Sequence, residues 1–341
     1  MRNYDMVLEQ IKGNTWVLKS WEVIPLYKLD ERRCILLDTG LADQREALEG
    51  ALQEAGLTCV GILGSHAHID HMGSHAYFQR KYGATLAMSL GETAVLHSRL
   101  GLNLQNYNLS ARQILDDPQL GDTMCLADQI ILPGDSRVTL CGVDFDIIHT
   151  PGHTIDHICV RTPDNVLYLG DAIMTGRTLF KSKFPYAFSV QDYFDSLRRI
   201  RTESADWYIV AHWGVYPEIL SFVDMEARFL SRRMQEILDL VDGVITAEEL
   251  TAKICQVYGI DAHSIVDLSY FERATRAYIF YLMDRGHMEA FMENNVILYR
   301  RLVGKVPPED VSAPGRDRTI PRPGSLSLQL LGLEGDLSSV P

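Results

Sequence analysis

The sequence predicts an α/β protein that continues into a small, mainly helical module. Short apolar strands alternate with amphipathic helices over roughly the first 216 residues. Histidine and aspartate recur where several of these strands end. From about Pro217 the pattern changes to long amphipathic helices, and after about residue 306 it becomes rich in Pro, Gly and Ser. We therefore expect an α/β domain over 1–220, a helical module over 221–305 and a flexible tail over 306–341.

Local patterns place the elements of the α/β domain. Runs of Val, Ile, Leu and aromatic residues predict strands, and Gly56 and Gly83 are typical of positions that follow a helix. A turn of Pro163, Asp164 and Asn165 separates two late strands. We expect strands within 5–11, 14–29, 34–40, 59–66, 84–89, 137–150, 156–163, 165–172 and 206–214, and helices within 41–56, 74–83, 91–101 and 190–203.

The helical module has clear boundaries. One or two helices are expected over 217–243, a second over 246–259 and a third over 268–286, followed by a hairpin over 287–301. Thr246 and Glu249 form a capping-box pattern, and Gly259 follows the helix that they begin. Three helices and a hairpin resemble a winged-helix module, and its simplest role is packing or dimerisation.

Composition narrows the classes of function. The 341 residues carry a net charge of −13, which disfavours a surface built for nucleic acid or anionic lipid. The chain has no apolar run long enough for a transmembrane helix, and its first residues do not resemble a signal or transit peptide. Six scattered cysteines without a C-x-x-C pair are typical of reduced core thiols. We expect a cytoplasmic protein with a small-molecule substrate, no membrane and no nucleic-acid partner, and a homodimer is compatible with these features.

The most informative stretch is "SHAHIDHMG", which places His66, His68, Asp70 and His71 directly after a predicted strand. Residues two apart on a strand share a face, so His66 and His68 can converge on one ion. A turn can direct Asp70 and His71 toward a second ion. Imidazole and carboxylate ligands suit Zn²⁺, with iron, manganese or cobalt as alternatives. Further donors stand at three later strand ends, in "TPGHT" (His153), "YLGDA" (Asp171) and "IVAHWG" (His212).

These four motifs, in this order, resemble the metallo-β-lactamase-fold metallohydrolases over about residues 5–216. "TPGHTIDHI" and "LYLGDAIM" are most similar to the glyoxalase II-like branch, which hydrolyses glutathione thioesters. The resemblance implies a four-layer αβ/βα sandwich with the site at one edge. It also implies two zinc ions. The first would be held by His66, His68 and His153, the second by Asp70, His71 and His212, with Asp171 bridging them.

The resemblance implies hydrolysis of a small ester, thioester, lactone or phosphoester by a metal-bridging hydroxide. Asp70 would orient the nucleophile and pass a proton to the leaving group as the catalytic carboxylate. Asp38 is either an acceptor that orients a ligand histidine or a turn residue. The C-terminal module departs from the glutathione-binding region of that branch, so the resemblance does not specify glutathione.

The sequence indicates the residues that contact the substrate less clearly than it indicates the metal ligands. The stretch after Asp171 carries basic and phenolic side chains that either recognise an anionic substrate group or belong to a solvated loop. Tyrosines near the motifs are further candidates for contacting an oxyanion. The candidate substrate residues are Arg177, Lys181, Lys183, Tyr186, Tyr216 and Tyr107.

Two other activities occur on the same fold. A persulfide dioxygenase would hold a single iron with fewer of these ligands, and the complete second ligand set disfavours it. A metal-dependent ribonuclease is disfavoured by the acidic charge and by the lack of an inserted clamp domain. A purely structural metal site is also disfavoured, because structural zinc sites are usually closed and rich in cysteine.

Overall fold

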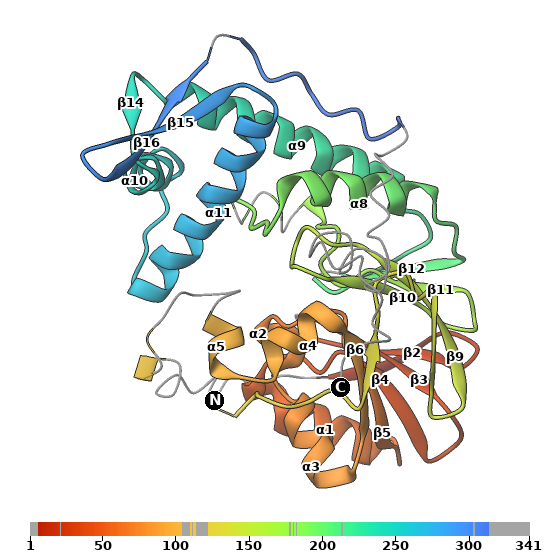
Figure 1. Ribbon diagram of the computed structural model, residues 1–341. Helices are drawn as coiled ribbons and strands as arrows, with labels where there is room; N and C mark the ends of the chain where they lie inside the picture. Colours follow the sequence, from red (N-terminus) through yellow and green to blue (C-terminus); the bar gives the residue numbers. More distant parts are fainter. Residues whose placement is uncertain are drawn as a thin grey trace, which may run out of the picture.

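The computed structural model describes residues 6–20, 22–103, 110, 112–113, 122–176, 179, 181, 183–212, 214–302 and 304–313. Two mixed sheets form the centre of the α/β domain (Figure 1). The first sheet has the order β1-β2-β3-β4-β5-β6-β7, with β4 to β7 parallel to one another. Its strands are β1 (Val7–Lys12), β2 (Thr15–Lys19), β3 (Val23–Lys28), β4 (Arg33–Leu37), β5 (Thr58–Leu63), β6 (Thr85–Ser89) and β7 (Gln129–Ile131).

The second sheet has the order β13-β12-β11-β10-β9-β8 and is antiparallel except for the β11–β12 pair. Its strands are β8 (Arg137–Leu140), β9 (Val143–His149), β10 (Ile158–Arg161), β11 (Val166–Tyr168), β12 (Trp207–Val210) and β13 (Gly214–Tyr216). A hydrogen bond from the Val23 amide to the Ala211 carbonyl joins the two sheets at one edge.

Buried side chains divide the domain into four layers. Alternate residues of a strand face opposite sides, so Ile35 and Leu37 pack between the sheets while Cys34 and Leu36 face the helices. Figure 1 shows α1 and α3 below the first sheet, and α8 and α9 (Leu220–Asp239) above the second. The predicted four-layer sandwich is confirmed. The helices of this part are α1 (Arg45–Glu54), α2 (Ile69–Met72), α3 (His75–Tyr82), α4 (Leu90–Leu96), α5 (Arg99–Leu102) and α8 (Val190–Thr202), with a 3-10 turn η1 (Ala42–Gln44).

The C-terminal module contains α9 (Leu220–Asp239), β14 (Val244–Ile245), α10 (Ala247–Tyr258), α11 (Ile265–Asp284), β15 (Met288–Glu293) and β16 (Val296–Arg301). The Thr246 and Glu249 capping box is present, and Gly259 takes the left-handed conformation that ends α10. The strands form a small sheet of order β14-β16-β15. The structure thus contains the expected helices and hairpin, and the winged-helix interpretation stays a prediction.

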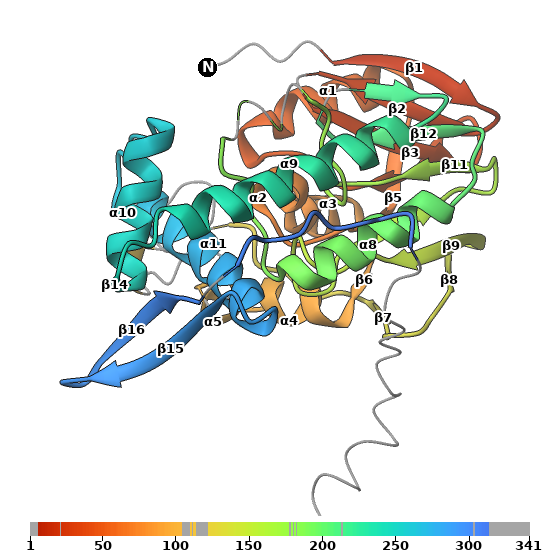
Figure 2. The same ribbon diagram turned by 90° about the horizontal axis from the view of Figure 1, so that it is seen from above.

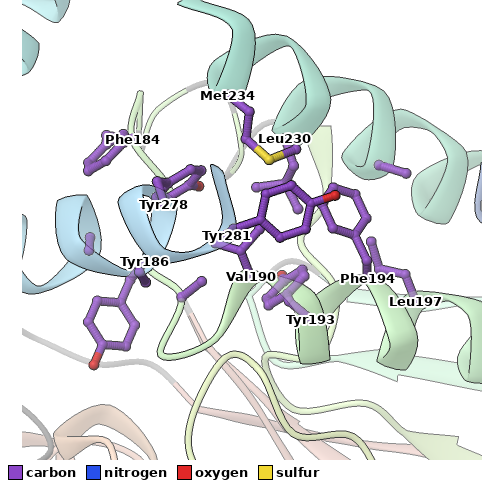
Figure 3. Packing of buried hydrophobic residues seen from close by; sticks show 14 of the residues in the cluster. Phe184, Tyr186, Val190, Tyr193, Phe194, Leu197, Leu230, Met234, Tyr278 and Tyr281 are labelled. Carbon is purple, nitrogen blue, oxygen red and sulfur yellow. The ribbon is translucent and has the colours of Figure 1, made fainter. Parts of the chain in front are cut away.

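One hydrophobic core joins the module to the α/β domain. It contains Phe194 of α8, Leu230 of α9 and Tyr278 of α11 together with Leu167 of β11. Figure 3 shows aromatic side chains of α8 and α11 in the same cluster as Leu230 and Met234 of α9, and Figure 2 shows α9 running beside α8 along the second sheet. The module therefore packs on the layer that carries the later metal-binding motifs.

Two local expectations differ from the structure. The flexible tail was expected from residue 306, but Val306 and Val311 are buried and Glu309 forms ion pairs with Arg198 and Arg285. These distant partners override the Pro-rich composition, and residues 314–341 lie outside the described part. The cysteines are all free thiols, but Cys141 is exposed rather than in the core. None of the described helices is both long and apolar enough to cross a membrane.

Candidate metal centre

Loops at one edge of the two sheets gather the seven predicted ligands. His66 and His68 follow β5, and the short helix α2 carries Asp70 and His71. The other three come from the second sheet, each just after a strand or in the connection between two strands. They are His153 between β9 and β10, Asp171 after β11 and His212 after β12.

The first group consists of three imidazoles and one carboxylate. His68 Nδ1 lies 3.1 Å from His66 Nε2 and 2.9 Å from His153 Nε2. Asp171 Oδ2 lies 3.4 Å from His153 Nε2. The four ligand atoms all lie within 4.8 Å of one another, so they converge on one point as the ligands of a single ion would.

The second group shares Asp171 with the first. Asp171 Oδ1 lies 3.4 Å from both His71 Nε2 and His212 Nε2, and Asp70 Oδ2 lies 3.4 Å from His212 Nε2. The two oxygens of Asp171 therefore face different groups, which is the geometry of a bridging carboxylate. The structure brings together all seven side chains that the sequence motifs indicated.

Asp38 fixes the orientation of His71. This aspartate has a left-handed backbone (φ 64°), and its Oδ2 accepts hydrogen bonds from His71 Nδ1 (2.8 Å) and the Tyr168 hydroxyl (2.7 Å). Ser65 donates to it through both its amide (2.7 Å) and its hydroxyl (2.5 Å). With its Nδ1 proton held by Asp38, His71 presents the lone pair of Nε2 to the site. The position of Asp38 is the one that the acceptor interpretation requires.

The same serine also orients the first group. Ser65 Oγ lies 2.9 Å from His66 Nδ1. Because the Ser65 hydroxyl donates to Asp38, its oxygen is available to accept the His66 Nδ1 proton. His66 Nε2 is then left facing His68. One buried aspartate thus positions a ligand of each group.

An unsatisfied buried atom shows that these residues fit a metal. His71 Nε2 is buried and has no hydrogen-bond partner among the described residues. A buried polar atom without a partner costs free energy, and a bound cation would remove that cost. The mixed nitrogen and oxygen donors suit a divalent transition metal such as zinc.

The electrostatics of the site also favour a cation. Burial lowers the pKa of His68 to about 3 and that of His153 to about 4, so both rings are neutral and able to ligate. Burial also disfavours the charged form of His71 and His212, but the carboxylates of Asp171 and Asp70 outweigh this and raise the pKa of both histidines. The two carboxylates therefore create a negative potential at the second group.

Glu92 was missed by the sequence analysis. This fully buried residue of α4 accepts the Ala67 amide through Oε2 (2.8 Å). Its Oε1 accepts the Thr154 hydroxyl (2.6 Å) and the Asp156 amide (2.9 Å). Ala67 stands between two ligand histidines and Thr154 follows the third, so Glu92 fixes both loops of the first group.

Glu226 of α9 supports the loop that follows the bridging aspartate. Its carboxylate accepts the Met174 amide (2.9 Å) and the Tyr193 hydroxyl (2.6 Å). Burial raises the pKa of Glu226 to about 8. A residue of the C-terminal module thus holds the backbone three positions beyond Asp171.

His157 is a second support for Asp171. Its Nε2 accepts the Asp171 amide (3.2 Å), and its Nδ1 lies 2.8 Å from the Thr150 hydroxyl. Gly170 passes directly over this ring with φ +50°, and a Cβ there would lie 2.7 Å from His157 Nε2. His157 matches none of the ligand positions in the sequence motifs, so the motifs gave no indication of this role.

Glu22 is a buried carboxylate beside the second group. Its Oε1 lies 3.8 Å from His71 Nδ1, and neither oxygen has a hydrogen-bond partner among the described residues. Burial raises the pKa of Glu22 to about 8. Its neighbours in the sequence gave no indication of this position.

The candidate substrate residues are distributed differently. Tyr186 is buried beside the first group, with its ring centre 5.5 Å from that of His68. Lys183 donates to the Gly259 carbonyl of the C-terminal module (2.8 Å), Lys181 is exposed, and Tyr216 packs against Phe222. A substrate role for these three stays a prediction. Arg177 and Tyr107 lie outside the described residues.

Fold and site together define a metal-dependent enzyme of the αβ/βα sandwich class. The family model of the metallo-β-lactamase superfamily matches residues 15–212, and the chain belongs to that superfamily. The match ends on His212, so it covers every predicted ligand.

Two curated relatives are named as hydrolases. The chain is similar to hydroxyacylglutathione hydrolase GloC of Haemophilus influenzae, with 26% identity over 195 residues, 56% of this chain and 84% of that protein. It is also similar to a hydroxyacylglutathione hydrolase of Synechococcus, with 27% identity over 158 residues, 44% of this chain. The chain spans 49% of that second protein. The predicted resemblance to the glyoxalase II-like branch of the superfamily is thereby confirmed.

A solved structure extends the similarity into the C-terminal module. A metallo-β-lactamase family protein from Thermus thermophilus superimposes with a TM-score of 0.64 at 20% identity, covering 89% of this chain and 99% of that one. At this identity the comparison establishes the fold alone. The fold is therefore shared with a solved structure over most of this chain.

Proposed function

We propose that this protein is a dinuclear metal-dependent hydrolase of a small thioester or related carboxylic ester. The observation that carries the proposal is the bridging position of Asp171 between two groups of histidines. The similarity to two proteins named hydroxyacylglutathione hydrolase supports a thioester in preference to a phosphoester or lactone. The six free thiols are consistent with a cytoplasmic location.

Zinc is the cation that we propose for both positions. Divalent ions held here would supply Lewis-acid chemistry, which acidifies a water and polarises a carbonyl oxygen. His66, His68 and His153 would hold one ion, Asp70, His71 and His212 the other, and Asp171 both. The persulfide dioxygenase alternative requires fewer ligands, and the presence of the complete second group speaks against it.

Asp70 is the proposed proton carrier. Its side chain is 27% exposed, more than Asp171 at 9%, so it can contact both water and substrate. Interaction with His71 and His212 lowers the pKa of Asp70 despite its burial, which keeps the carboxylate ionised. Thioester hydrolysis adds water across the carbon–sulfur bond, and Asp70 would carry the proton from the water to the leaving thiolate.

The proposal is tested on purified protein loaded with zinc. We expect about two zinc ions per chain by elemental analysis, and thioester hydrolysis that falls at least 100-fold in His66→Ala and Asp171→Ala. A matched control is His97→Ala, because His97 is exposed and bonds only to a nearby backbone carbonyl within the described residues. Full activity in metal-free protein, or a single iron with oxygen consumption, would contradict the proposal.

A further inference from the structure

A pocket of about 390 Å³ lies along one face of α11, and none of its lining residues is a predicted metal ligand. Most of its lining residues recur at three- and four-residue spacing, so they project from the same side of the helix. One further wall comes from the segment that precedes α8. The lining residues are Ser269, Glu272, Arg273, Arg276, Ala277 and Phe280 of α11, with Phe188 opposite them.

Tyr186 connects this pocket to the metal ligands. Its ring stands edge-on to His68 and His153, with centres 5.5 and 6.0 Å apart, and stacks on Tyr270 of α11 at 4.7 Å. Its hydroxyl interacts with Arg273 through a side-chain hydrogen bond. A single aromatic side chain therefore separates the Arg273 guanidinium from the first group of ligands.

The segment that carries Tyr186, beside the pocket, is held in place before any ligand binds. Phe184 stacks on Tyr278 of α11 with ring centres 4.9 Å apart, and the Tyr278 hydroxyl donates to the Pro185 carbonyl (3.1 Å). Figure 3 shows Phe184 beside Tyr278, and the Tyr186 ring extending away from the rest of the cluster. The pocket is therefore preformed, which reduces the entropic cost of binding.

Arg273 is the cation best placed to contact a ligand in the pocket. It is half-buried, its Nε is buried without a hydrogen-bond partner among the described residues, and it lies 5.8 Å from the Phe188 ring. Arg276, by contrast, already pairs with Glu248. A guanidinium with an unused buried donor favours an acceptor of matching planar geometry.

The charge and shape of the pocket indicate what that acceptor is. Glu272 also lines the pocket and opposes a multiply charged anion such as phosphate, whereas one negative charge suits a single guanidinium. Phe188 and Phe280 provide apolar surface for carbon atoms beside the charge. The chemistry is that of a ligand with a short apolar body and one carboxylate.

We propose that this pocket binds a carboxylate-bearing part of the substrate and that Arg273 sets the preference for it. The inference rests on the proposed hydrolase function and names the substrate class of that site. The substrate carboxylate would bind the Arg273 guanidinium, and the thioester carbon would extend past Tyr186 toward the metal ligands. The C-terminal module would thereby supply the specificity of the enzyme.

The kinetic test compares matched thioesters. Succinyl and 4-methylpentanoyl thioesters of one neutral thiol have similar shapes but differ in the terminal carboxylate. A second pair places the carboxylate on the thiol, in 3-mercaptopropionate, against a neutral thiol of similar size. We expect Arg273→Ala to raise KM about 10- to 100-fold for a carboxylate substrate in at least one pair, the loss typical of a charge-assisted hydrogen bond. Its neutral partner should change less than about threefold.

Two further variants separate recognition from structure. Arg300→Ala removes an exposed arginine of the same module that pairs with Glu289 and lies outside the pocket, and it should leave both substrates within about twofold. Arg273→Lys restores the charge without the planar fork and should recover part of the loss. An equal loss for charged and neutral substrates, or no loss in either pair, would overturn the inference.

A binding experiment is independent of turnover. Phenylacetate and its neutral analogue phenylacetamide are titrated into zinc-loaded wild-type protein and Arg273→Ala. We expect wild type to prefer phenylacetate at least tenfold and the variant to lose that preference. If no thioester is hydrolysed but the preference is present, the hydrolase proposal fails and the pocket assignment stands. If hydrolysis occurs and neither experiment shows a preference, the pocket assignment fails alone.

Discussion

Replacing Asp38 with asparagine tests whether the hydrogen bonds around this carboxylate support metal binding. Asparagine has nearly the same shape and tolerates the left-handed backbone (φ 64°), so the change alters hydrogen bonding without straining the chain. In the native structure Oδ2 accepts from His71, Tyr168 and Ser65, and Oδ1 accepts the Ser65 amide. Every partner is a donor.

The asparagine amide must therefore present its NH₂ group to at least one donor. The most favourable orientation keeps the carbonyl toward the His71 side and sets the NH₂ against the Ser65 amide. One hydrogen bond to a charged acceptor is lost, worth about 1.5–3 kcal/mol, and the remaining ones are weakened by the loss of charge. We expect the free energy of unfolding to fall by about that amount and zinc affinity to fall about 10- to 100-fold.

Zinc affinity is measured by competition with a chromophoric chelator, and stability by urea denaturation of the metal-free protein. Tyr168→Phe is the matched control, because it removes one donor to Oδ2 and leaves the His71 contact. Its effect should be well below that of Asp38→Asn. Zinc affinity within twofold of wild type in Asp38→Asn, at unchanged stability, would refute the role assigned to this carboxylate.

Three further substitutions probe the supports of the ligands. Gly170→Ala would place a Cβ 2.7 Å from His157 Nε2 and should cost about 1–3 kcal/mol in a urea melt, whereas Gly56→Ala meets open space at a similar φ and should cost less. In Glu92→Gln the side-chain NH₂ group must face one of the donors that Glu92 accepts, so one hydrogen bond to a ligand loop is lost. Zinc release, measured by stopped flow, should therefore accelerate about tenfold. Glu226→Gln should remove a pH-dependent loss of stability in urea melts between about pH 4.5 and 8.

The sign of the Glu226 effect follows from burial. Below about pH 4.5 the carboxyl is protonated in both states. As pH rises toward 8, the unfolded chain loses the proton while the folded protein keeps it, so the unfolding free energy falls by up to about 1.4 kcal/mol per unit. Parallel pH profiles for wild type and Glu226→Gln would contradict this. Equal losses of unfolding free energy in Gly170→Ala and Gly56→Ala would contradict the prediction for Gly170. Unchanged zinc release in Glu92→Gln would contradict the prediction for Glu92.

The ligands could be predicted because each lies in a short motif at a strand end. His66, His68 and their neighbours form one uninterrupted string, and Gly152 and Gly170 stand directly before His153 and Asp171. The signals that mark helix ends are equally short, as the capping box at Thr246 shows. Sequence patterns of this kind depend on neighbours a few residues away, which is the range over which local conformation is decided.

The supports of those ligands could not be predicted for the same reason. Glu92 and Glu226 each occupy a helix, where a glutamate is usually a solvated residue. Their partners are 25 and 52 positions away, at Ala67 and Met174, so only the tertiary fold reveals the contact. The basic residues after Asp171 show that a residue close in sequence to a ligand can have its contacts elsewhere. Lys183 lies close in sequence to a ligand, yet it bonds to the C-terminal module.

The C-terminal helices complete the site from two directions. From α9, Glu226 satisfies the Met174 amide behind the bridging aspartate, and from α11, Tyr270 and Tyr278 hold the segment that carries Tyr186. Without them, a buried amide beside Asp171 would lose its acceptor and the wall beside His68 would lose its backing. The sequence pattern therefore changes near residue 220, but residues on both sides of this boundary contribute to the same site. The ligands come from the α/β domain, and their rigidity and the proposed substrate preference come in part from the module.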